Sequence, residues 1–196
     1  NSVDFEIPGT LGIIYDVATW QQRRQQPRAF PLFHLPDYLA STDRSATLNF
    51  VRTDLPQLTK EAVARLKKDD TTVLVIDTQN EHGYAELRRL FVELMEADCP
   101  IPVVIARRYQ GLNEEEFQLY AGTDVGGLLV DGLGDGVMLS ADQNPRLLNA
   151  TAFNILQASR TRISKTEYIS CPSCGRTLFD LQETTAKIRS RTSHLK

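Results

Sequence analysis

Short runs of aliphatic and β-branched residues alternate with amphipathic helical segments along most of the chain, and this alternation restricts the possible folds more than any other feature. The runs that predict buried strands are residues 11–17, 47–52, 72–77, 102–106, 126–130 and 137–140. Between them, segments such as 84–97 and 144–163 carry their apolar residues on one helical face. A repeat of this kind predicts an α/β fold with a parallel sheet and right-handed connections.

The length available to the repeat limits the form of the sheet. We expect residues 1–158 to form the α/β domain, 159–168 to be a linker and 169–196 to open a small second module. A complete (β/α)₈ barrel needs roughly 250 residues, so a barrel here is partial or reduced. An open doubly wound sheet is the alternative, because it fits the same order of strands and helices.

Composition excludes several classes of partner. The chain has 22 basic and 25 acidic residues, a net charge of -3, so it lacks the overall basic charge of a nucleic-acid-binding domain. No apolar run approaches the roughly 20 residues of a membrane span, and residues 1–11 lack the features of a secretory signal. We therefore expect neither nucleic acid nor membrane as a partner. Three cysteines are too few for a disulfide scaffold and favour a reducing compartment.

Two of these cysteines, Cys171 and Cys174, form a Cys-x-x-Cys pair that is followed at once by a helical pattern. Pro172 fixes its own φ and Gly175 permits unusual backbone angles, so both thiols can point at one centre. The amino end of the following helix favours thiolates, the form that ligates metal. The pair is therefore interpreted as a ligand or redox element, whereas Cys99 is expected to be a small buried residue at a helix end.

Spacing leaves more than one chemistry open for the pair. A zinc knuckle needs two further ligands, and the chain has no second Cys-x-x-Cys or suitably spaced histidine. A thioredoxin-like dithiol belongs in a βαβ core, whereas this pair follows a linker near the end of the sequence. Two thiolates of an iron–sulfur cluster, with the other ligands downstream, are the third possibility. Local sequence does not separate the zinc and iron–sulfur interpretations.

A glycine-rich stretch at residues 131–136 is a weaker candidate site. It follows a predicted strand, where the amides around Gly132, Gly134 and Gly136 could cradle a phosphate. The stretch lacks the Lys-Ser/Thr of a P-loop and the full dinucleotide fingerprint, so a structural turn between two strands is favoured. A phosphate-ligand function for the α/β domain rests on this loop.

Charged residues and histidines offer few further candidates. Arg107 and Arg108 leave the carboxyl end of a predicted parallel strand, where α/β proteins bind ligands. The histidines, His34, His82 and His194, are isolated in the sequence and are expected at the surface or in caps. Acidic groups such as Asp69–Asp70 and residues 114–116 lie where helices end or begin, which predicts ordinary solvated charges.

Residues 165–182, which contain the cysteine pair, closely resemble the start of the iron–sulfur domain of the hydroxymethylbutenyl diphosphate synthase family. Residues 131–137 are also similar to that family, in particular to its three-domain form from plastids and some bacteria. In that form an inserted domain lies between the catalytic barrel and the iron–sulfur domain. The resemblance is specific from about residue 122 to residue 195.

The resemblance implies a role for the pair. Cys171 and Cys174 match two of the three cysteines that, with one glutamate, hold a 4Fe-4S cluster; the third cysteine and the glutamate belong to a Gly-Cys-x-Val-Asn-Gly-Pro-Gly-Glu stretch beyond Lys196. Such enzymes reductively open 2-C-methyl-D-erythritol 2,4-cyclodiphosphate to 4-hydroxy-3-methylbut-2-enyl diphosphate in isoprenoid biosynthesis. Reduced flavodoxin or ferredoxin is the implied electron donor, and bacterial cytoplasm or plastid stroma the implied location.

Three expectations follow from the resemblance. The first 158 residues correspond to the inserted domain, whose role is structural, and residues 169–196 to a truncated start of the iron–sulfur domain. By itself this piece is expected to be inactive and without a cluster, its two thiols free. Its partner is the catalytic barrel of the same polypeptide, and the insert takes the place of the second subunit of two-domain relatives. A non-catalytic zinc-knuckle interaction module is the alternative.

Overall fold

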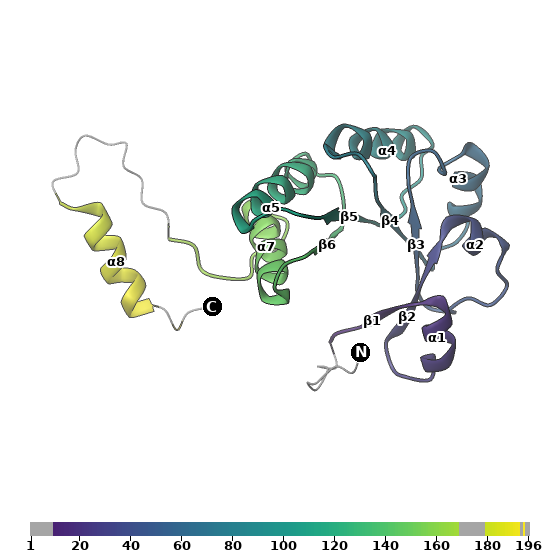
Figure 1. The fold of residues 1–196 in the computed structure, drawn as a ribbon, viewed down its shortest axis with the longest axis horizontal. Coiled ribbons are helices and arrows are strands. Elements are labelled where there is room, and N and C mark those ends of the chain that lie inside the picture. Colours follow the sequence, from purple (N-terminus) through teal and green to yellow (C-terminus); the bar gives the residue numbers. More distant parts are fainter. Residues whose placement is uncertain (1–9, 169–178, 193, 195–196) are drawn as a thin grey trace.

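A computed structural model describes residues 10–168, 179–192 and 194, and its centre is a curled sheet of six parallel strands (Figure 1). The strands are β1 (Ile13–Asp16), β2 (Ala29–His34), β3 (Asn49–Thr53), β4 (Thr72–Ile76), β5 (Val103–Tyr109) and β6 (Gly136–Ala141). They neighbour one another in chain order, β1-β2-β3-β4-β5-β6, without the reversal that a doubly wound sheet requires. The expected α/β fold with a partial barrel is confirmed, in the form of a half-barrel.

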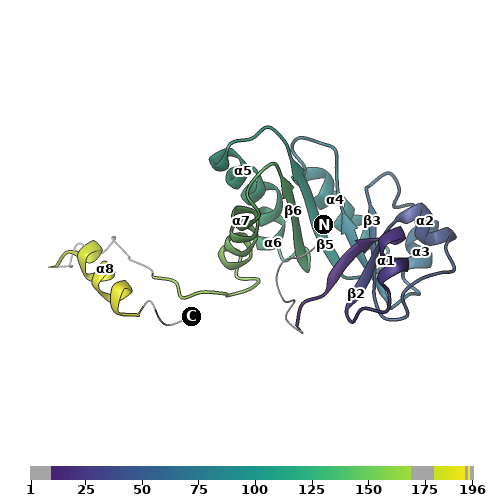
Figure 2. The ribbon, with the colours of Figure 1, turned by 60° about the horizontal axis from the view of Figure 1, so that its bottom comes forward.

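Helices connect the strands and lie along the outer, convex side of the sheet (Figures 1 and 2). They are α1 (Val17–Arg23), α2 (Leu35–Ala40), α3 (Lys60–Leu66), α4 (Tyr84–Glu96), α5 (Glu114–Ala121), the π-helix η1 (Gly122–Gly126), α6 (Gly127–Val130) and α7 (Pro145–Ala158). Side-chain caps explain several of their starts. Thr59 and Asn144 cap α3 and α7, and Asn113 forms a capping box with Glu116 at the start of α5.

The core lies between the convex face of the sheet and the helices. Leu74 and Ile76 of β4 and Ile105 of β5 are completely buried against Leu87 and Leu90 of α4. Burying each side chain of this size contributes about 1.5–3 kcal/mol. The alternating residues of the same strands face the concave side, which explains why β3 shows alternating buried and half-buried positions.

Two elements differ from the sequence-based expectations. Strand β2 was not predicted, because its aromatic residues and Pro31 gave no clear alternation. Residues 126–130 were predicted to be a strand but belong to η1 and α6. An apolar run this short is compatible with both the helical and the strand periodicity, so the pattern does not decide between them. Gly127 is required there, because a Cβ at this position would lie 2.9 Å from the ring of Tyr84.

Two finer expectations are also wrong. Met95, which the pattern of residues 84–97 places on the apolar face of that helix, is 59% exposed. Asp69, expected to be solvated, accepts hydrogen bonds from Tyr38 Oη and Thr71 Oγ1 and pairs with Arg44. Burial by itself raises the pKa of Asp69, but the hydrogen bonds from Thr71 and Tyr38 outweigh this effect. The pKa of Asp69 therefore lies below its ordinary value. Asp69 thus fastens the end of α3 to α2.

A last helix, α8 (Leu181–Thr192), comes after α7 in the chain and confirms the helical pattern predicted after the cysteines. The sequence after the cysteines predicts an apolar stripe that includes Leu178, Ile188 and Leu195. None of the described residues of α8 is buried, and Ile188 is 51% exposed. The stripe residues Leu178 and Leu195 lie outside the described residues. Across the described part of the chain, every helix is too short or too polar to traverse a bilayer.

Candidate functional site

The cysteine pair, Cys171 and Cys174, lies outside the described residues. Cys99 is described and is buried after α4, as predicted, with burial raising the pKa of its thiol. Within residues 10–168, 179–192 and 194, no three His, Cys, Asp or Glu side chains gather as a metal site would need. The described residues therefore direct attention to the other candidates, the glycine loop and the strand-end arginines.

The glycine loop at residues 131–136 connects α6 to β6, so it lies at the amino edge of the sheet and not after a strand as predicted. Gly132 and Gly134 have φ angles of 77° and 96°. The carboxylate of Asp135 accepts a hydrogen bond from the backbone N–H of Val103 at 2.8 Å. The backbone N–H of Asp135 donates in return to the carbonyl oxygen of Val103 at 2.7 Å. These contacts fix the start of β6 against β5, as a structural turn does. The ligand-binding edge of a parallel sheet is the opposite one.

Replacing Gly134 with Ala is expected to lower the free energy of unfolding by about 3 kcal/mol, because the backbone is left-handed and the new Cβ would lie 2.7 Å from Ile105 Cδ1. Gly132→Ala is the matched control: it has a similar φ but no neighbour within 4 Å, so only the backbone cost of about 1–2 kcal/mol applies. Urea unfolding measures both. Equal losses would contradict the packing role of Gly134.

At the carboxyl edge, Arg107 of β5 is buried and fully engaged. Its Nε donates to Asp124 Oδ2 of η1 at 2.9 Å, and its Nη atoms donate to the carbonyls of Thr78, Asn80 and Glu81 at 2.9–3.1 Å. The guanidinium also packs on Gly83, where a Cβ would lie 2.7 Å away. Arg107, a sequence-based candidate for ligand binding, therefore holds the loop after β4 to the end of β5.

Tyr109 completes this buried cluster. Its Oη donates to Asp124 Oδ2 at 3.2 Å, so the carboxylate accepts from both Tyr109 and Arg107. Burial, reinforced by the charge of Asp124, raises the pKa of the Tyr109 phenol well above its ordinary value. The phenol accordingly stays protonated and acts as a donor. The cluster uses all its charges internally.

Beside this cluster, a hollow of about 590 Å³ opens at the carboxyl ends of β2–β5. Arg52, Asp77 and Arg108 line it, together with His34 and the loop after β4. A smaller hollow of about 200 Å³ continues from it and shares His34, Arg52 and Asp77. His34 is exposed as predicted, and although it is the N-cap residue of α2, its side chain accepts no capping hydrogen bond. We call the two connected spaces the strand-end hollow.

Arg52 of β3 is the functional candidate that the sequence did not reveal. Among the described residues, its buried Nε has no hydrogen-bond partner, and the one partner of Nη2 is Met138 Sδ, at 3.7 Å. The signal in the sequence that could have identified Arg52 is the presence of a charged residue in the second half of a predicted buried strand. Arg108, which was predicted, is exposed at the same edge. Both predicted arginines line the hollow, but Arg107 is engaged by internal acceptors, whereas Arg108 and Arg52 have no oxygen acceptor among the described residues.

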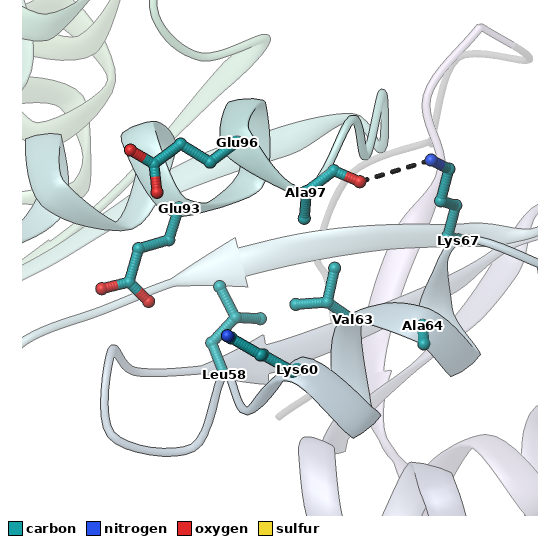
Figure 3. Close-up of a pocket in the computed structure, with 8 residues that line it drawn as sticks. All are labelled: Leu58, Lys60, Val63, Ala64, Lys67, Glu93, Glu96 and Ala97. Carbon is teal, nitrogen blue, oxygen red and sulfur yellow. Dashed lines mark hydrogen bonds between the residues drawn. The ribbon is translucent and has the colours of Figure 1, made fainter.

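A second concavity, of about 660 Å³, lies between α3 and α4 on the convex side (Figure 3). Leu58 and Val63 form its apolar part, Lys60 and Lys67 lie along one side, and Glu93 and Glu96 along the other. Lys67 Nζ donates to Ala97 O at 3.3 Å and pairs with Asp98. These charges are spread along the groove and do not converge on one point, so it lacks the features of a catalytic centre.

Comparison with curated proteins links nearly the whole chain to one enzyme name. The 4-hydroxy-3-methylbut-2-en-1-yl diphosphate synthase (flavodoxin) of Parabacteroides distasonis is 41% identical over 191 residues, 97% of this chain, and that of Bacteroides fragilis is 40% identical over 96% of it. The chloroplastic, ferredoxin-dependent synthase of Arabidopsis thaliana is 50% identical over 141 residues, 69% of this chain. No protein-family model matches.

The matches cover only part of each relative. The chain spans 31% of the Parabacteroides protein and 19% of the Arabidopsis protein. An alignment that covers 97% of this chain also spans the cysteine pair. The similarity found at residues 122–195 therefore extends over almost the entire chain.

Proposed function

Nearly the whole chain is homologous to one segment of the 4-hydroxy-3-methylbut-2-en-1-yl diphosphate synthases, and we propose that it serves as the inserted α/β domain and the start of the iron–sulfur domain of such an enzyme. The single observation that carries this proposal is the match to the Parabacteroides synthase over 97% of the chain, the cysteine pair included. The domain limits proposed are residues 1–158, 159–168 and 169–196.

The parent enzyme would reductively open 2-C-methyl-D-erythritol 2,4-cyclodiphosphate to 4-hydroxy-3-methylbut-2-enyl diphosphate, with flavodoxin or ferredoxin as electron donor. Cys171 and Cys174 would hold two irons of a 4Fe-4S cluster, because closely spaced thiolates suit this cofactor. The cluster supplies one-electron transfer when bound. This chain's own contribution is to fix the two thiolates at the end of a linker that leaves the half-barrel after α7.

The half-barrel itself is proposed to be a scaffold. Its buried strand-end arginine, Arg107, is saturated by internal acceptors, and its glycine loop lies at the amino edge and fixes β6 to β5. Neither offers catalytic chemistry. We propose that the scaffold packs against the catalytic barrel of the same polypeptide, in the place of a partner subunit. Bacterial and chloroplastic relatives support a bacterial cytoplasm, or alternatively a plastid stroma, as the location.

Metal and sulfide analysis of the whole protein tests this proposal. Purified anaerobically and without chelator, the protein is expected to contain iron and acid-labile sulfide in nearly equal amounts and little zinc. A zinc-knuckle module would instead contain stoichiometric zinc and no labile sulfide. Stoichiometric zinc with no iron would overturn the iron–sulfur assignment of the pair.

A further inference from the structure

The strand-end hollow is lined by two arginines, Arg52 and Arg108, that have no oxygen acceptor among the described residues, although the buried Arg107 beside them is well supplied with acceptors. Arg107 donates to one carboxylate and three carbonyls, and half-buried Arg44 donates to two carbonyls and Asp69. In the same part of the molecule, Arg52 contacts only a thioether, and Arg108 makes no hydrogen bond or ion pair with any described residue. Two free guanidinium groups thus face one concave space.

Leaving the Nε–H group of Arg52 buried and unpaired costs free energy. A ligand oxygen that accepts a hydrogen bond from this group would recover that free energy. The exposed surface arginines of the chain carry no such cost, because water satisfies them. The unpaired group lies at the carboxyl ends of parallel strands, the edge at which α/β sheets bind ligands. The position and the unsatisfied donor both indicate an anionic ligand.

We propose that the strand-end hollow binds a phosphate group of a small molecule through Arg52 and Arg108. Each guanidinium presents a planar fork of donors that matches two oxygens of a phosphate. A carboxylate has only two oxygens and is satisfied by one fork, whereas a tetrahedral phosphate can accept from both. The volume of about 590 Å³ is ample for a small phosphate ester.

Asp77 also lines the hollow and opposes an anion. Its Oδ1 accepts from the N–H of Thr78, so the carboxylate is partly occupied by its own loop. Because its negative charge lies in the same space as the ligand, Asp77→Asn is expected to tighten phosphate binding several-fold. This opposite direction distinguishes an anion site from a hollow that merely loses structure on mutation.

The test is a titration of the ¹⁵N-labelled chain with inorganic phosphate and, separately, with inorganic diphosphate at constant ionic strength. The Nε–Hε signals of Arg52 and Arg108 are expected to shift saturably with one shared Kd. Arg52→Gln and Arg108→Gln should each weaken binding at least about tenfold, the effect of losing charged hydrogen bonds. Arg108 is exposed, so its variant keeps the fold even if Arg52→Gln does not.

Arg23→Gln is the matched control, since it removes one exposed positive charge from α1, a helix that does not line the strand-end hollow, and should leave Kd unchanged. Absence of saturable shifts with both anions would overturn the proposal. Equal shifts with acetate would overturn the phosphate assignment. If Arg23→Gln weakened binding as much as Arg52→Gln and Arg108→Gln do, the anion would be attracted by the overall charge of the chain and not by a specific site, which would also overturn the proposal. Because none of these measurements involves the cysteine pair, their failure leaves the iron–sulfur proposal untouched.

Discussion

Replacing Asp124 with Asn is expected to lower the free energy of unfolding by about 3–5 kcal/mol, one of the largest losses available to a single substitution in this chain. The change leaves the Arg107 guanidinium charged, while its side chain is only 3% exposed. The three carbonyls that remain as acceptors cannot neutralise that charge. Tyr109 also loses the carboxylate to which its phenol donates.

Urea unfolding followed by circular dichroism measures the loss. The matched control is Asp131→Asn, which removes the same charge from the Arg88–Asp131 pair, whose side chains are 45% and 38% exposed. Because solvent screens that pair, a much smaller change is expected. Similar losses for the two variants would show that the Arg107–Asp124 pair has no special role in stability.

The double variant Arg107→Met/Asp124→Leu separates the pair from its parts. Each single substitution removes one charge of the pair and leaves the other buried without its counter-charge, whereas the double variant removes both charges. Its loss is expected to be clearly smaller than the sum of the losses for Arg107→Met and Asp124→Leu. Additive losses would instead mean that the two side chains act independently, contrary to the 2.9 Å contact between them.

The buried pair also shows where prediction from sequence stops. That Arg107 lies at a strand end follows from the run of apolar residues before it, which is a local pattern. Its partner, Asp124, is seventeen positions later, just before the segment 126–130 that was predicted to be a strand, and the packing of η1 against β5 brings the two side chains together. Local periodicity does not encode such a contact, so Arg107 and Arg108 were given the same interpretation.

Elements of strong periodicity were predictable, and ambiguous ones were not. Strands β3 to β5 and helix α4 follow from long, regular patterns, and the length limit correctly indicated a partial barrel. Strand β2 contains Pro31 and was missed, while the Gly126–Gly127 pair allows a close helix where a strand was expected. The sequence could not distinguish Arg52 from other arginines as a candidate ligand-binding residue. What marks it as a candidate is that its buried Nε has no hydrogen-bond partner among the described residues, which only three-dimensional contacts reveal.

In the whole protein that we propose to contain this segment, Cys171→Ser and Cys174→Ser are each expected to abolish cluster binding, with loss of visible cluster absorbance and of the iron and labile sulfide. Serine offers a hydroxyl with a far higher pKa than a thiol, so it does not supply the anionic sulfur ligand that iron–sulfur clusters require. If the proposed assignment is right, reductive ring opening is lost in parallel. Anaerobic reconstitution with iron and sulfide, followed by absorbance and metal analysis, measures the effect.

Cys99→Ala is the control that makes this result specific. Cys99 is 8% exposed, and burial raises the pKa of its thiol, so it packs as a small apolar group and is not a ready ligand. Removing it should leave the cluster spectrum unchanged. A cluster that survives Cys171→Ser, or one that is lost in Cys99→Ala with the fold intact, would transfer the ligand role away from the Cys-x-x-Cys pair. An unchanged urea midpoint for Cys99→Ala establishes independently that the fold is intact, because Cys99 lies in the half-barrel core whose unfolding the midpoint reports.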